Sequence, residues 1–205
     1  MKSALRRRLS MLLLLLIILA AVTVSQKYPV INRIEVSGAA HYTPQEIASL
    51  AGIAYEEPLL WVTAFSLQPL MSDPWIASAT VNRDLRGTVT ISVNERRAVA
   101  TNGVQTFAID GTVLPGVRAH EAAALVRLEG WGTSRIDEAL ELTALLANLA
   151  PKVISYSPAG FNIQLENSSV FTPTVNALKT HWASFLSQQG THASVYPWGV
   201  SASYE

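Results

Sequence analysis

One uncharged, mostly apolar run, residues 9–24, constrains this chain more than any other feature. Four basic residues precede the run, and every segment able to fold into a domain follows it. Such a run either stays in a bilayer as an anchor or is removed as a signal peptide. In both cases the basic end remains on the cytoplasmic side of the membrane. We therefore expect residues 26–205 to lie outside the cytoplasm.

The length of the run and its flanking residues favour an anchor. Counted as residues 9–25 it has 17 residues, at the short end of the roughly 17–25 that cross a bilayer as a helix. Arg8 and Lys27 can snorkel to the interfaces, and Tyr28 stands where an interfacial aromatic would lie. A cleaved signal peptide remains the alternative: Thr23 and Ser25 are small enough for a cleavage site, although the end of the run lacks an Ala-x-Ala pattern. We expect a cytoplasmic tail over residues 1–8 and a transmembrane helix over residues 9–25.

Composition then removes several classes of function. Since four of the 15 basic residues precede the run, the remainder has 11 basic and 15 acidic residues and a net charge of −4. This mildly acidic balance gives no electrostatic case for binding nucleic acid. The chain has no cysteine, which excludes disulfides, a thiol nucleophile and a cysteine-ligated metal. Stability must therefore come from apolar burial.

The first folded lobe has the element order β-α-α-β-β. A capping box, Thr43 with Glu46, and Pro44 at the first helical position predict a helix start. A second helix is expected over residues 64–72, shortened or kinked by Pro69. The remaining elements are strands, expected over residues 30–36, 76–83 and 88–95. This order predicts an α+β layer arrangement.

The sequence motifs of this lobe are similar to those of a known family. The order of elements directly after an N-terminal anchor resembles a POTRA domain, the polypeptide-transport-associated module. The motifs resemble the signature of the bacterial cell-division FtsQ/DivIB family: Asp73-Pro74-Trp75-Ile76, Ala79-Thr80-Val81-Asn82-Arg83, Val89 to Val93, Glu95-Arg96 and Val99-Ala100. The sequence departs from the family pattern at Leu85-Arg86-Gly87 and at Arg97, where a proline is common. The resemblance implies a POTRA domain over residues 26–100.

A second lobe over residues 101–205 is expected to be an FtsQ-type β domain, a mostly antiparallel sheet with two helices. The first helix is expected from its cap Ser134 to Leu149, and the second from Thr172-Pro173 to Gly190. Phe107-Ala108-Ile109-Asp110-Gly111 resembles a hairpin of the same family. The whole chain is thus expected to be α+β, with one transmembrane helix and two lobes.

The last segment predicts an edge strand. Large residues occupy even positions from Tyr196 to Tyr204 and small residues the odd positions, which is the period of a strand with two unlike faces. The larger residues are expected in the core, and Pro197 indicates a sheet edge. Because no charge occurs between Lys179 and Glu205, such an edge could accept a partner strand. An ordinary strand covered by a loop remains the alternative. The candidate partner-binding residues are Tyr196, Trp198, Val200, Ser201, Ser203 and Tyr204.

No arrangement of residues predicts catalysis. The four histidines, His41, His120, His181 and His192, lack metal-ligand spacing, and His41 is expected to be a solvated loop residue. No nucleophile motif, phosphate-binding loop or dinucleotide fingerprint is present. We therefore expect no enzyme activity, no metal and no cofactor.

The resemblance implies a non-catalytic scaffold of cell division. It would be a single-pass protein of the cell (inner) membrane at the division septum, with a cytoplasmic N-terminus. The family binds the FtsB–FtsL pair through its far C-terminal strand region, so the resemblance implies such divisome partners and no small-molecule substrate. The alternative is a POTRA-containing factor of envelope assembly or secretion that binds client polypeptides. A secreted hydrolase with unrecognised machinery is a third option.

Overall fold

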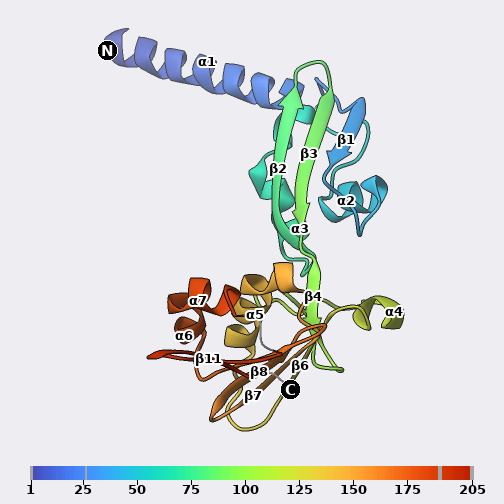
Figure 1. Ribbon diagram of the computed structural model, residues 1–205. Helices are drawn as coiled ribbons and strands as arrows, with labels where there is room; N and C mark the ends of the chain where they lie inside the picture. The colour runs from blue at the N-terminus through green and yellow to red at the C-terminus, as the bar shows by residue number, and fades with distance from the viewer. Residues whose placement is uncertain (1, 26, 189–190, 204–205) are drawn as a thin grey trace. The chain divides into compact units, whose positions relative to one another are not determined.

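The computed structural model describes residues 2–25, 27–188 and 191–203, with side chains from Met11 onward (Figure 1). The chain divides between Glu95 and Arg96 into two compact units, each with its own apolar core. The first unit begins with helix α1, Lys2–Ser25. Burial of apolar side chains therefore occurs separately within each unit.

The predicted helix over residues 9–25 forms as part of α1. Within the part of the chain that the structure describes, however, no helix has both the length and the hydropathy that a membrane crossing requires.

The rest of the first unit is a three-stranded sheet with short helices. Strand β3 is central, with β1 parallel on one side and β2 antiparallel on the other. The buried side chains of β3 alternate along the strand, as the sequence predicts. The elements are β1 (Arg33–Ser37), α2 (Pro44–Leu50), η1 (Leu59–Trp61), η2 (Ala64–Leu67), α3 (Gln68–Met71), β2 (Ile76–Asp84) and β3 (Thr88–Glu95).

Local signals explain where these elements begin and end. The capping box of Thr43 and Glu46 is present at α2, as expected. The helix expected over residues 64–72 is split into η2 and α3, and Pro69 lies in the first turn of α3, where its missing N–H costs no hydrogen bond. Gly38, with φ of +84°, ends β1; a Cβ atom there would lie 2.0 Å from the Val93 carbonyl oxygen, so only glycine fits.

Two signature motifs of this unit hold the loop between β1 and α2. The Glu95 carboxylate accepts backbone N–H bonds from Ala40 at 2.8 Å, His41 at 2.6 Å and Tyr42 at 3.2 Å. Asp73 accepts from the Tyr42 hydroxyl at 2.9 Å and from the backbone N–H of Trp75 at 2.8 Å. Burial, and then the hydrogen bond to Asp73, raises the pKa of Tyr42 to about 12. These contacts fasten the loop to β3 and to the start of β2.

The histidine of this loop is part of the same structure. The rings of His41 and Trp75 are stacked 3.7 Å apart at 8°, and His41 meets Tyr42 edge-on at 4.8 Å. His41 is an exposed loop residue, as expected, and one face of its ring stacks on the indole of Trp75.

We predict that Glu95→Gln loosens this loop. The variant loses the charge that strengthens three hydrogen bonds and replaces one acceptor oxygen with a donor, which should cost about 1–3 kcal/mol. Hydrogen exchange at the amides of Ala40, His41 and Tyr42 should accelerate. Glu35→Gln is the matched control, because Glu35 lies on β1 and pairs only with Arg33 across two exposed side chains. Unchanged exchange in Glu95→Gln would contradict the assigned role.

The second unit contains an eight-stranded sheet in the order β11-β10-β9-β8-β7-β6-β4-β5. The ladders β4–β6, β6–β7 and β9–β10 are parallel and the ladders β4–β5, β7–β8, β8–β9 and β10–β11 are antiparallel, so the sheet is mostly antiparallel, as expected, but mixed. The cause is that helices connect β6 to β7 and β9 to β10, and a parallel neighbour needs such a crossover. The strands are β4 (Ala98–Thr101), β5 (Thr106–Ala108), β6 (Val126–Gly130), β7 (Val153–Ser157), β8 (Gly160–Gln164), β9 (Ser169–Thr172), β10 (His192–Tyr196) and β11 (Gly199–Ser203).

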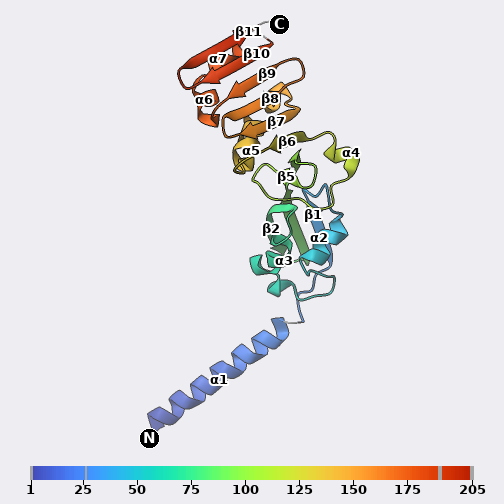
Figure 2. The same cartoon turned by 90° about the horizontal axis from the view of Figure 1, so that it is seen from below.

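Three of the helices of this unit share one face of the sheet (Figure 2). Buried residues of α5, α6 and α7 form one core with Phe161, Ile163 and Val195 from the strands. The second expected helix is broken at His181, which separates α6 from α7. The helices are α4 (Ala119–Ala122), α5 (Ile136–Leu145), η3 (Ala147–Leu149), α6 (Val175–Thr180) and α7 (Trp182–Leu186). The opposite face of the sheet carries Asn162 and Ser194 together with the aromatic residues Phe171 and Tyr196.

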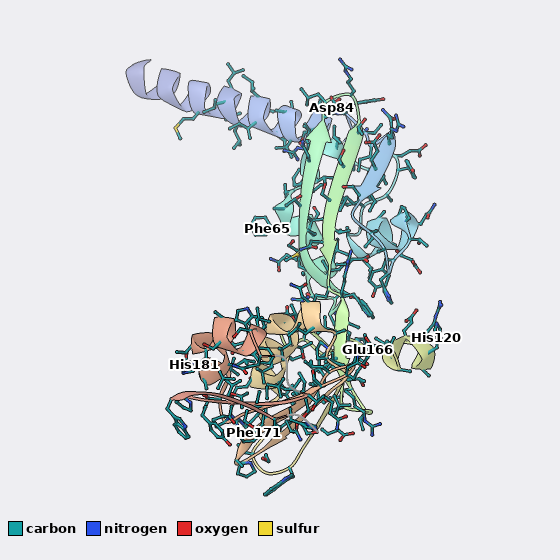
Figure 3. The ribbon with its side chains drawn as sticks, in the orientation of Figure 1. Phe65, Asp84, His120, Glu166, Phe171 and His181 are labelled. Carbon is teal, nitrogen blue, oxygen red and sulfur yellow. The ribbon has the colours of Figure 1, made fainter. Side chains whose placement is uncertain are left out.

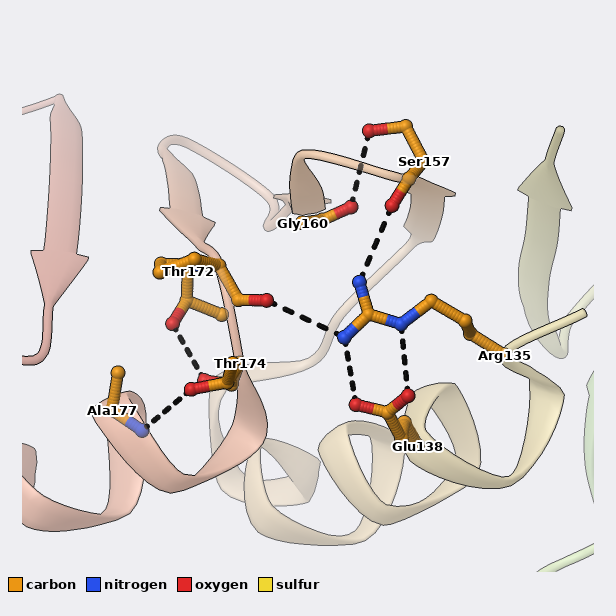
Figure 4. Close-up of polar contacts among 8 residues, drawn as sticks. Arg135, Glu138, Ser157, Gly160, Thr172, Thr174 and Ala177 are labelled. Atoms are coloured by element: carbon orange, nitrogen blue, oxygen red, sulfur yellow. Dashed lines mark hydrogen bonds and ion pairs between the residues drawn. The ribbon is translucent and has the colours of Figure 1, made fainter. Parts of the chain in front are cut away.

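One arginine connects the start of α5 to two strand loops (Figure 4). Arg135, and not Ser134, is the N-cap residue. Its guanidinium binds both carboxylate oxygens of Glu138, at 2.8 and 2.7 Å, and donates to the Ser157 carbonyl at 3.2 Å and the Pro173 carbonyl at 3.4 Å. It also lies 4.1 Å from the centre of the Phe161 ring. These hydrogen bonds to Arg135 hold the pKa of Glu138 below its usual value.

We predict that Arg135→Met destabilises the second unit by about 1–3 kcal/mol, because charged hydrogen bonds are lost while the apolar stem remains. Glu138 has a depressed pKa when folded, so its contribution is present above the unfolded value of about 4.3 and is lost as pH falls through the folded value. The free energy of unfolding of the second unit is measured by urea denaturation of the full chain, with hydrogen exchange of the β8 amides as the readout. The difference in this free energy between wild type and variant should become smaller as the pH is lowered.

The matched control is Arg127→Met. Arg127 pairs with Glu129 at 2.8 Å, but its side chain is 67% exposed against 18% for Arg135. An exposed pair of this kind contributes little, so this control should stay close to wild type. Equal losses in the two variants would contradict the special role of Arg135.

Candidate partner-binding edge

The side chains that could bind a metal or take part in catalysis are scattered over the described residues. Among residues 2–25, 27–188 and 191–203, no group of three or more metal-ligating side chains lies together. The His192 ring nitrogen Nδ1 lies 2.6 Å from the Ser169 hydroxyl, and His181 Nε2 lies 3.1 Å from the Pro197 carbonyl oxygen. His120 lies beside Glu121, at 4.0 Å, with both side chains exposed. These contacts connect neighbouring segments, and the Ser169–His192 pair places a hydroxyl beside an imidazole in an exposed contact between the paired strands β9 and β10.

A cavity of about 690 Å³ opens beside α5, lined mainly by alanines and other apolar residues of the surrounding loops and strands. Its polar lining residues are Thr143, Arg127 and Lys152. The Thr143 hydroxyl donates to the Ala139 carbonyl at 2.8 Å, and Arg127 pairs with Glu129. These groups offer neither a hydroxyl next to a base nor a set of metal ligands.

The two edges of the eight-stranded sheet differ. At one edge, β5 is covered by the chain that follows it: Ala108 N–H donates to the Thr112 carbonyl at 2.9 Å, and Leu114 N–H donates to the Thr106 carbonyl at 2.8 Å. At the other edge, β11 pairs with β10 alone among the described strands. Strand β11 has no charged side chain. Within residues 2–25, 27–188 and 191–203, no further strand pairs with its outer side, so we call β11 the unblocked edge.

The last segment is a hairpin, and the single strand expected from Tyr196 onward is wrong. Tyr196 pairs with Gly199, so Pro197 and Trp198 form a two-residue turn between β10 and β11. Val195, fully buried, pairs with Val200, which packs against the core. Gly199 has a φ of +157°, in the region that favours glycine, where the chain leaves the turn.

The hairpin places the candidate residues on two faces. Ser201 and Ser203 lie on the face of the sheet away from the core, which we call the open face, and they pair with Ser194 and His192. Val200 faces the core. Tyr196 also lies on the open face, two residues after Ser194. The large residues thus do not share one face as expected, and Trp198 at the turn is 79% exposed. Tyr204 lies outside the described residues.

Aromatic rings gather at the turn of this hairpin. The Tyr196 and Trp198 rings stack 4.9 Å apart at 8°, and Phe171 of β9 lies 5.9 Å from Tyr196. His181 contacts the same turn from the helix side, through Pro197, while Phe171 lies on the other side of the sheet (Figure 3). No local sequence pattern places Phe171 beside Tyr196, because their proximity depends on the parallel pairing of β9 with β10.

Comparison with known proteins identifies the first folded unit. The model of the POTRA domain, FtsQ-type, matches residues 29–96. This segment is an FtsQ-type POTRA domain. The resemblance inferred from its motifs is confirmed over these residues.

Two curated relatives share parts of the chain with this POTRA domain. A protein of Corynebacterium glutamicum named cell division protein FtsQ is 37% identical over 67 residues, which are 32% of this chain and 30% of that protein. A protein of the same name from Bradyrhizobium diazoefficiens is 30% identical over 134 residues, 63% of this chain and 38% of that protein. The chain thus spans about a third of the length of the curated relatives it matches.

The motif residues of the POTRA domain make contacts that stabilise its fold. Asp73, Trp75 and Glu95 hold the β1–α2 loop, as described above. Arg96, next in the sequence, pairs with Asp110 at 2.7 Å, and this contact holds the pKa of Asp110 below its usual value. The motif residues that carry the resemblance thus make contacts with the β1–α2 loop and with Asp110.

Proposed function

We propose that this chain is a non-catalytic scaffold of bacterial cell division that receives divisome partners of the FtsB–FtsL type at the β11 edge. The observation that carries the proposal is an unblocked sheet edge in a chain that also contains an FtsQ-type POTRA domain. The names of the curated relatives support a role in cell division. The proposal needs no substrate and no cofactor.

We further propose that α1 anchors the protein in the cell (inner) membrane at the septum, with residues 1–8 in the cytoplasm. Support comes from its side chains: the apolar residues from Met11 to Leu19 are each more than half exposed. Exposed apolar surface on this scale is rare in a soluble protein and calls for a covering partner or a lipid phase. The domain boundaries near residues 25 and 100 belong to the same proposal.

The chemistry of β11 suits the addition of a partner strand. Alternate residues of an edge strand direct their N–H and C=O groups away from the sheet, and a partner can satisfy them. Natural sheets commonly block such edges with lysine, proline or a covering segment. Segment 112–114 covers the β5 edge in this way, whereas β11 carries Ser201 and Ser203 on its open face and Val200 on its core face. The partner strand would thus continue both faces of the sheet.

We predict that Ser203→Lys weakens the co-purification of divisome partners while the fold is kept. A lysine on an edge strand opposes pairing with a further strand, because its charge would be desolvated at the contact. Co-purification from membranes, with circular dichroism to verify the fold, measures both effects. Asn162→Lys is the matched control, because Asn162 is exposed on the same face but lies on the interior strand β8.

Three outcomes would contradict this account. Unchanged co-purification in Ser203→Lys would exclude the β11 edge as the interface. Equal loss in Asn162→Lys would move the interface from the edge to the open face. Recovery of nascent envelope polypeptides in place of small membrane partners would favour the envelope-assembly alternative.

A further inference from the structure

Five exposed aromatic or aliphatic side chains lie in segments that meet at one end of the POTRA domain. We name this set the Trp61 corner. Its members are Tyr28 (70% exposed), Tyr55 (63%), Leu60 (37%), Trp61 (56%) and Leu85 (77%). They come from the chain just after α1, from the segment around η1 and from the β2–β3 turn. Apolar side chains that gather on a surface in this way indicate a contact site.

Backbone hydrogen bonds fix all of these segments to the residues that follow α1. Leu59 N–H donates to the Pro29 carbonyl at 2.9 Å, and Ile31 exchanges hydrogen bonds of 2.9 Å with Glu56 and Glu57. Asn32 N–H donates to the Gly87 carbonyl at 2.8 Å, which secures the β2–β3 turn. The corner is thus built around the point where the chain enters the domain.

The segment that carries Trp61 is held by an arginine. Arg83 Nη1 donates to the Leu60 carbonyl at 2.6 Å and also to the Val62 carbonyl. Because the guanidinium gathers the carbonyl groups of η1 inward, Leu59 is fully buried while Leu60 and Trp61 remain outside the core. The exposure of Trp61 is therefore set by a defined local structure.

The corner is also close to the apolar helix along the chain. Pro29 lies only four positions after Ser25, the last residue of α1. A chain of that length spans at most about 14 Å when extended. The N–H groups of Lys27 and Tyr28 both donate to the Val24 carbonyl at 3.0 Å, which makes the distance shorter still. A bilayer that holds α1 would thus have its headgroup region within reach of the corner.

We propose that the Trp61 corner docks against the headgroup region of the bilayer that holds α1; this rests on the anchoring proposed above. Tryptophan and tyrosine prefer this region because their rings are apolar at one end and polar at the other. The charges of the segments that form the corner balance, so zwitterionic phospholipid suffices for docking. These charged residues are Lys27, Arg33, Arg83, Arg86, Glu35, Glu56, Glu57 and Asp84.

Docking would fix the height of the POTRA domain above the membrane. Two contacts, the α1 connection and the corner, restrain a domain much more than a single flexible tether does. The domain would then present a constant side to partners in the same membrane. Phe65, 79% exposed, belongs to a different region: it lies along the side of β2, away from the turn marked by Asp84 (Figure 3).

The natural absence of cysteine allows a direct test with single labels. The full chain carrying Leu85→Cys is labelled with a nitrobenzoxadiazole fluorophore and reconstituted in phosphatidylcholine vesicles. Quenching by iodide in the water and by lipids spin-labelled near the headgroup is then measured. We expect iodide quenching severalfold below that of the same protein in denaturant, together with strong quenching by the spin-labelled lipid. Addition of Trp61→Ser should reverse both effects, whereas Trp61→Tyr should preserve them.

Phe65→Ser is the matched control, because it removes an exposed aromatic ring of the same domain and should leave the label protected. A second label, at Leu16→Cys in α1, reports on anchoring itself. If the label at position 16 is protected by lipid and the label at position 85 is not, docking is wrong and the anchor stands. If neither label is protected, both proposals are overturned. Equal effects of Trp61→Ser and Phe65→Ser would also contradict docking.

Discussion

A sheet that does not close on itself ends in two strands whose outer backbone groups need partners, and this requirement organises the second unit. The chain satisfies one edge internally, since segment 112–114 folds back over β5. It leaves the other edge, β11, with one neighbour among the described strands. Because backbone N–H and C=O groups are costly to bury without partners, the open edge can remain only where water or another chain satisfies it.

Within each unit, a few charged or aromatic residues hold irregular backbone in place. Glu95 binds three amides of one loop, Asp73 and Trp75 bind the same loop, and Arg135 joins α5 to two strand connections. Each uses charge or ring stacking to hold irregular backbone in place. The surfaces proposed for contacts instead consist of small uncharged residues at the β11 edge and of exposed aromatic and leucine side chains at the Trp61 corner.

Local patterns predicted much of the first unit and less of the second. Alternation gave β3 with its bounds, and the Thr43 capping box gave the start of α2. The alternating pattern after Tyr196 predicts one strand, but the structure has a hairpin there. Across its two-residue turn, an odd-numbered residue pairs with an even-numbered one. Val195 and Val200 therefore share a face of the sheet, whereas Tyr196 lies on the other face. Sheet order and the proximity of Phe171 to Tyr196 depend on long-range pairing, which no local pattern contains.

The open β11 edge is the central claim, and residue-resolved hydrogen exchange of the full chain tests it most directly. In the protein alone, alternate amides of Gly199–Ser203 should exchange rapidly while those of the interior strand β8 stay protected. In membranes that also contain the FtsB–FtsL-type partners, the rapid amides of β11 should become protected. Protection of every β11 amide in the protein alone, or no change when the partners are present, would contradict the account.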